Sequence, residues 1–101
     1  MLDLYTDSNP AKTEANFYIR HNRPDANVTV TIQVYNMMGQ QVWTNTTTGR
    51  SDMYLSMPVT WNLTDNSGVR VNRGIYLYRA TISTDGVNES SATKRIAVCG
   101  D

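Results

Sequence analysis

The chain has 101 residues, which is enough for one domain with a hydrophobic core of its own. Lys plus Arg and Asp plus Glu number nine each, so the formal net charge is zero. A chain without a basic excess is poorly suited to nucleic acid or to an anionic membrane surface, because both attract clustered cations.

The sequence has neither a covalent staple nor an apolar membrane segment. Its single cysteine, Cys99, excludes an intrachain disulfide and a multi-cysteine metal cluster. No apolar stretch approaches the ~20 residues of a membrane-spanning helix, so we expect no membrane span. Residues 1–12, which include "DSNPAKTE", are predicted to be a flexible lead-in or linker. Residues 13–101 are predicted to form one β-sandwich domain.

The first half of the chain alternates between apolar and polar residues, as half-buried strands do. Phe17 and Ile19 share one face of the first predicted strand. The second predicted strand has four apolar residues in step: Val28, Val30, Ile32 and Val34. "NMMG", with Gly39 free to adopt a positive φ, turns the chain into a hairpin partner over Val42–Thr46. A polar loop, "TTTGRSD", is expected to follow.

The second half alternates over residues 53–57, 59–63 and 76–82. Bends are expected at Pro58, which lacks an N–H, and at the turn sequences "DNSG" and "VNRG". A last strand is predicted over Val87–Val98. Turn signals recur roughly every 8–12 residues and separate about seven strands. The sequence therefore predicts an all-β protein with an immunoglobulin-like antiparallel β-sandwich.

One segment, "WNLTDNSGVRVNRGIYLY", gathers aromatic and turn residues in a way that raises the question of a binding site. Aromatic side chains at inward strand positions bury a large area and keep a polar tip at the rim. Asp, Asn and Gly are the residues that a tight turn needs. We therefore interpret the segment as architecture. Its structural residues are Trp61, Asp65, Gly68, Gly74, Tyr76 and Tyr78.

Residues capable of catalysis are few and scattered. His21 and Cys99 could in principle form a nucleophilic dyad, but no glycine elbow surrounds Cys99, and His21 stands beside "NRP" at a strand end. "DNSG" supplies too few oxygen atoms for a calcium site, and Asp85–Gly86 is a turn pair. We expect no catalytic residue, no cofactor and no metal site in this chain.

Three segments resemble those of a known secretion system. "FYIRHNRPDANVTVTIQVYNMMGQQVW" is similar to the opening of the C-terminal domain of the gingipain-type sortase of the type IX secretion system. "TWNLTDNSGVRVNRGIYLYRA" resembles the core of FlgD-type immunoglobulin-like domains, which the sortase tail shares. "NPA" at residues 9–11 and "KRIAV" at Lys94–Val98 resemble the start and end motifs of type IX C-terminal signal domains. The usual "WDG" or "WNG" reads Trp61-Asn62-Leu63 here.

The resemblance implies a function that composition alone does not show. Such a domain would target its parent cysteine peptidase through the type IX system, across the periplasm, to the outer-membrane surface of a Bacteroidetes-type bacterium. There it would dock with an outer-membrane β-barrel protein, PorV, and other secretion components. The catalytic residues of that family lie in an upstream peptidase domain, so Cys99 and His21 do not inherit their role.

The last strand is the predicted docking element, because an outer strand can accept a partner strand. Its candidate residues are Lys94, Arg95, Ile96, Ala97 and Val98. Lys94 and Arg95 either contribute a charged contact or protect an edge against aggregation, and the sequence leaves both open. The "HNRP" loop is either a second contact or a structural turn. Zero net charge and an exposed edge are compatible with an edge-paired homodimer.

Three other functions remain as alternatives. A cleavable C-terminal signal of a type IX cargo protein would need a susceptible linker at residues 3–12. A surface adhesin-type sandwich would need outward aromatic residues in one patch, for which Trp43, Tyr54 and Tyr18 are the candidates. A flagellar-hook-type assembly domain would share the FlgD-like core, but "HNRP" and "KRIAV" count against it.

Overall fold

The computed structural model describes residues 3–7, 10–20, 27–50, 59–84, 87–90 and 93–99. Eight strands and no helix lie within these residues. Consequently, nothing in the described ranges qualifies as an apolar helix long enough to cross a membrane. The strands are β1 (Asp3–Thr6), β2 (Ala15–Arg20), β3 (Asn27–Tyr35), β4 (Gln41–Arg50), β5 (Val59–Trp61), β6 (Gly74–Thr84), β7 (Val87–Ser90) and β8 (Lys94–Val98).

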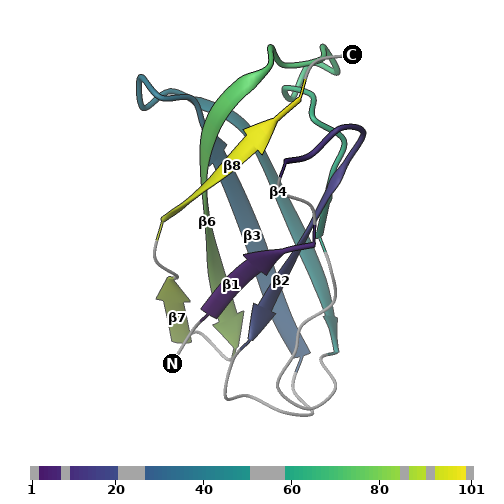
Figure 1. Cartoon of the computed structure of the whole chain (residues 1–101). Coiled ribbons are helices and arrows are strands. Elements are labelled where there is room, and N and C mark those ends of the chain that lie inside the picture. The colour runs from purple at the N-terminus through teal and green to yellow at the C-terminus, as the bar shows by residue number, and fades with distance from the viewer. Residues whose placement is uncertain are drawn as a thin grey trace.

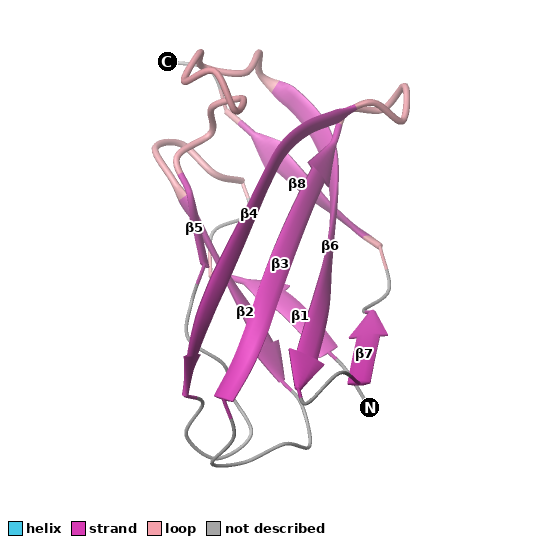
Figure 2. Cartoon of the chain, turned by 180° about the vertical axis from the view of Figure 1, so that it is seen from behind, coloured by secondary structure: helices cyan, strands magenta, loops and turns pink. Residues whose placement is uncertain are grey.

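The strands form two antiparallel sheets that face each other (Figure 1). One sheet has the order β1-β2-β5, and the other has the order β4-β3-β6, with β7 and β8 both paired to β6. Figure 2 shows the second sheet from its outer side, with β4 at one edge. The predicted all-β sandwich is confirmed. The predicted last strand, Val87–Val98, is divided into β7 and β8, which pair with opposite halves of β6.

The segment predicted as a flexible lead-in contributes to the sandwich. Asp3–Thr6 pairs with β2 along its whole length, and Leu4 is fully buried. The Asp7 carboxylate accepts hydrogen bonds from the Asn16 backbone N–H (3.1 Å) and the Asn16 side chain (3.0 Å). The polar sequence hides this structure, because Leu4 and Ala11, the buried apolar residues among those described in the lead-in, are too far apart to show a period.

Strand β4 continues through part of the segment predicted as a polar loop. Within that segment, Thr46 and Thr48 pair with β3, and their hydroxyls lie 3.0 Å and 3.2 Å from those of Thr31 and Thr29. Threonine is β-branched and favours strands, and cross-strand Thr–Thr pairs add stability. Polarity alone therefore gave the wrong boundary for this strand.

The β3–β4 hairpin is closed by one asparagine. The Asn36 side-chain oxygen accepts hydrogen bonds from the backbone N–H groups of Met38 (2.9 Å) and Gln40 (3.0 Å). The Gly39 N–H donates to the Asn36 carbonyl (3.0 Å), and Gly39 has a φ of 85°. The predicted turn at "NMMG" is therefore confirmed, with glycine at the left-handed position.

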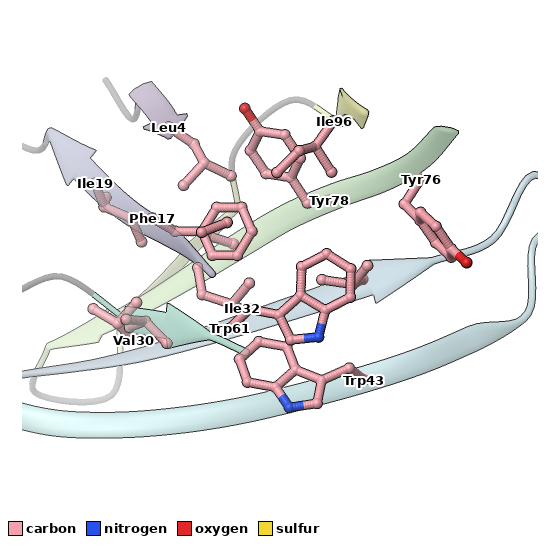
Figure 3. Packing of buried hydrophobic residues seen from close by; sticks show 14 of the residues in the cluster. Leu4, Phe17, Ile19, Val30, Ile32, Trp43, Trp61, Tyr76, Tyr78 and Ile96 are labelled. Carbon is pink, nitrogen blue, oxygen red and sulfur yellow. The ribbon is translucent and has the colours of Figure 1, made fainter. Parts of the chain in front are cut away.

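The core between the sheets is dominated by an aromatic cluster (Figure 3). The ring of Trp61, which is fully buried, lies 6.0 Å from Trp43, 5.9 Å from Tyr76 and 6.5 Å from Phe17, measured between centroids. Phe17 in turn lies 4.8 Å from Tyr78. The Trp61 indole N–H donates to the Thr64 carbonyl at 2.8 Å, so its polar atom is satisfied.

Trp43 points into this core, which corrects the interpretation of Trp43 as an outward aromatic. The pairing of β3 with β4 shifts between Val34↔Trp43 and Tyr35↔Gln41, which leaves Val42 as an extra residue. An extra residue in one strand changes which face the following side chains occupy. The bulge therefore places Trp43 against Trp61.

Replacing Trp61 with Phe should lower the free energy of unfolding by about 2 kcal/mol, because the core loses part of the indole and the Thr64 hydrogen bond. Urea denaturation followed by circular dichroism measures this change. Met38→Ala, at a hairpin position 83% exposed, is the matched control and should shift stability by less than about 0.5 kcal/mol. Equal effects for the two variants would contradict the central position of Trp61.

Replacing Gly39 with Ala should destabilise the protein by about 1 kcal/mol, because φ is positive at this residue. An added Cβ would meet no atom within 4 Å, so conformational strain is the expected cause rather than a clash. Gly39→Asn is the control, since asparagine tolerates this conformation better. Urea denaturation should rank Gly above Asn and Asn above Ala, and an Ala variant as stable as the parent would refute the argument.

Candidate docking site

The two motifs that resemble the ends of a type IX signal domain meet in the structure. Ala11, from "NPA", forms a parallel bridge with Val98, the last residue of "KRIAV". The Ala11 N–H donates to the Ala97 carbonyl, and the Cys99 N–H donates to the Ala11 carbonyl, both at 2.8 Å. Ala11 is fully buried. The lead-in therefore lies beside the end of β8, on the side of β8 away from β6.

Arg70 joins the same two segments through its guanidinium group. Its Nη2 atom donates to the Lys12 carbonyl at 2.7 Å and to the Cys99 carbonyl at 3.2 Å. A charged donor strengthens both hydrogen bonds. We call Ala11, Lys12, Arg70, Val98 and Cys99 the terminal clasp.

The "DNSG" turn positions Arg70 for these contacts. The Asp65 carboxylate accepts hydrogen bonds from the N–H groups of Ser67 (2.9 Å) and Val69 (3.0 Å), and Gly68 has a φ of 86°. The chain then returns through a bridge between Thr64 and Arg70. Asp65 thus accepts hydrogen bonds within the turn, and the turn positions Arg70.

The predicted docking residues of β8 are divided between the core and the surface. Ile96 and Val98 are buried and belong to the core, so their side chains cannot contact a partner in the folded domain. Lys94 and Ala97 are half-buried, and Arg95 is exposed. The register sets Arg95 opposite Leu77 and Ala97 opposite Ile75 on the outer face of the sheet. Arg95 is therefore the candidate with an accessible charge.

The remaining predicted structural residues flank this site. The Tyr76 hydroxyl donates to the Asn72 carbonyl at 2.7 Å, and burial raises the pKa of that hydroxyl. Gly74, with a φ of 151°, begins β6 directly opposite Val98. Tyr78 is buried against Phe17. These contacts hold β6 in place, and β6 is the strand with which β8 pairs.

The residues considered for chemistry or for an aromatic patch do not come together. Cys99 is half-buried and contributes its backbone to the clasp, whereas His21 and the rest of "HNRP" lie outside the described residues. Tyr18 is half-buried and stacks on Tyr5 with a centroid distance of 5.3 Å. Tyr54 also lies outside the described residues. In the described ranges, no three His, Cys, Asp or Glu residues are grouped as metal ligands would be.

Arg70 is the site residue that the sequence did not reveal. Its two partners are 58 and 29 residues away along the chain. No local motif predicts such contacts, and the surrounding "SGVRVN" indicates only a turn followed by a polar bend.

No protein-family model and no curated protein matches this sequence. Among solved structures, the whole chain superposes on part of dimeric latent PorU from Porphyromonas gingivalis, with a TM-score of 0.86 and 28% identity. FlgD from P. aeruginosa matches 93% of this chain over 73% of its own, with a TM-score of 0.62 and 19% identity. PorZ, an essential surface component of the type IX secretion system of P. gingivalis, matches 96% of this chain over 11% of its own, with a TM-score of 0.52 and 18% identity.

At these identities FlgD and PorZ show the fold alone. The likeness to PorU supports more than a shared fold, because it combines higher identity with coverage of the entire chain. This chain spans only 9% of PorU. The sequence motifs pointed to the C-terminal domain of PorU, and the resemblance to PorU is confirmed along the whole chain.

Proposed function

We propose that this chain is a non-catalytic sorting and docking domain of a type IX sortase. The observation that carries the proposal is the likeness to PorU over the full length of the chain. It is supported by the meeting of "NPA" and "KRIAV" in the terminal clasp, since these are the motifs that resemble the two ends of a type IX signal. The same likeness supports a secretion-related domain of a secreted or surface protein.

In this proposal the domain acts through its surface, and the chemistry belongs to its parent. The parent is a gingipain-like cysteine peptidase, which the domain carries through the periplasm and holds at the outer-membrane surface. PorV is the proposed partner. Arg95 is the proposed charged contact, and the outward side chains of Ala97 and Ile75 are the apolar contacts beside it. An exposed cation next to small apolar surface is a common arrangement at interface rims.

A cleavable cargo signal is the second candidate, and the structure favours it less. It needs a susceptible linker at residues 3–12, but Asp3–Thr6 is a paired strand and Ala11 and Lys12 are held by the clasp. The adhesin-type alternative is also less favoured, because Trp43, a candidate for its outward aromatic patch, is buried.

A binding measurement with purified PorV in detergent tests the docking role. The folded domain should bind, and Arg95→Glu should weaken binding about tenfold, which corresponds to ~1.4 kcal/mol. Arg20→Glu is the matched control, because Arg20 is an exposed cation on β2, in the opposite sheet. Truncation of the tail is unsuitable, because it would remove Ile96 and Val98 from the core. Absence of binding by the intact domain would overturn the proposal, and equal losses in both variants would move the contact away from β8.

Replacing Arg70 with Ala should loosen the terminal clasp without unfolding the sandwich. The amide hydrogens of Ala11 and Cys99 should exchange faster, because both donate in the clasp, while those of β3 stay protected. Hydrogen–deuterium exchange followed by mass spectrometry measures this. Arg73→Ala, a change at a neighbouring exposed arginine, is the control. Unchanged exchange at both amides would show that Arg70 does not hold the two segments together.

A further inference from the structure

We propose that β4 is a self-association edge, through which two copies of this chain pair their β4 strands antiparallel about a two-fold axis. This inference goes beyond the docking function, and it concerns the edge opposite to β8. β4 is the end strand of its sheet, ten residues long, and pairs with β3 along its length (Figure 2). An end strand presents a row of backbone groups that can accept another strand.

The hydrogen bonds of Thr44 show which backbone groups point outward. Its N–H donates to the side-chain oxygen of Asn66, and its carbonyl accepts from the Asn66 amide, each at 3.1 Å. Asn66 thus makes with Thr44 the two hydrogen bonds that a neighbouring strand would otherwise make. Because outward and inward groups alternate along a strand, Thr46 and Thr48 direct their N–H and C=O groups the same way. Neither residue has an edge partner among the described residues.

Most of β4, from Gln41 to Gly49, lacks the charged residues and prolines that normally protect an edge strand. No residue from 27 to 49 is charged, none is proline, and the first charge after the hairpin is Arg50. Natural proteins commonly guard an edge with lysine, proline or a covering segment. β8 differs from β4 in both respects, since it carries the charges of Lys94 and Arg95 and its end is paired with Ala11. The contrast identifies β4, rather than β8, as the edge suited to strand pairing.

A second copy is the occupant that this edge fits best. β4 already pairs antiparallel with the threonines of β3, through the hydroxyl contacts Thr31–Thr46 and Thr29–Thr48. Antiparallel pairing of two β4 strands places threonines of one copy opposite threonines of the other copy, on the same outer face. The row of threonine contacts between β3 and β4 would then continue into the second copy. An isologous contact of this kind closes after two copies. Gln41–Gly49 carries no charge, and antiparallel pairing centred on Thr46 would place the two Arg50 residues at opposite ends of the contact. Together with the zero net charge of the chain, this limits repulsion between the two copies.

Sedimentation of the purified domain from about 1 μM to about 1 mM tests the proposal. A concentration-dependent dimer is expected. Thr46→Lys should weaken it at least about tenfold, because it places two cations across the two-fold contact. Thr31→Lys is the matched control. It breaks the same hydroxyl contact and adds the same charge to the same face, but one strand away from the edge.

Two further samples separate the edge from indirect effects. Thr48→Pro removes one outward N–H without adding charge and should also weaken the dimer, with circular dichroism confirming that the variant folds. An equimolar mixture of Thr46→Lys and Thr46→Glu chains should associate again, because opposite charges then face each other. A monomer throughout the concentration range would overturn the proposal. So would equal losses in Thr46→Lys and Thr31→Lys, whatever the outcome of the PorV measurement.

Discussion

Burial of Trp61 between the two sheets is the interaction on which the rest of the structure depends. Its backbone belongs to β5 in the three-stranded sheet, while its ring contacts Trp43 and Tyr76 of the five-stranded sheet. Its indole N–H fixes the Thr64 carbonyl, where the "DNSG" turn begins. That turn directs Arg70 toward the terminal clasp. A single buried side chain thus connects the core to the proposed docking end through a short series of local contacts.

Periodicity predicted the parts of the fold that alternate cleanly. β2, β3 and β6 have apolar residues at every second position, and the structure buries those residues as expected. The length of β4 was not predictable in this way, because its threonines are polar in composition but form a strand through their cross-strand contacts. The orientation of Trp43 depends on a one-residue bulge, and a bulge has no hydrophobic signature. Arg70 joins segments far apart in sequence, so only the folded chain reveals it.

Leu63 shows how a departure from a sequence pattern is accommodated. It stands where the resembling domains have the glycine of "WDG" or "WNG", and its φ is 62°, in the left-handed region. A leucine in this conformation costs about 1–2 kcal/mol relative to an ordinary one. Leu63 is also fully buried, which contributes stabilisation of about 1.5–3 kcal/mol. The two terms are comparable, so hydrophobic burial explains how the chain retains a backbone conformation that suits glycine better.

The parallel bridge between Ala11 and Val98 also determines how the domain would respond to force. Tension applied to the chain just before Ala11 and just after Cys99 would pull these adjacent segments in opposite directions along the strands, because the bridge is parallel. The hydrogen bonds of Ala11, and the two that Arg70 donates, would then be loaded together in shear instead of opening one by one. Contacts loaded in parallel share the tension. The terminal clasp would therefore resist such tension as a unit, with its hydrogen bonds sharing the load.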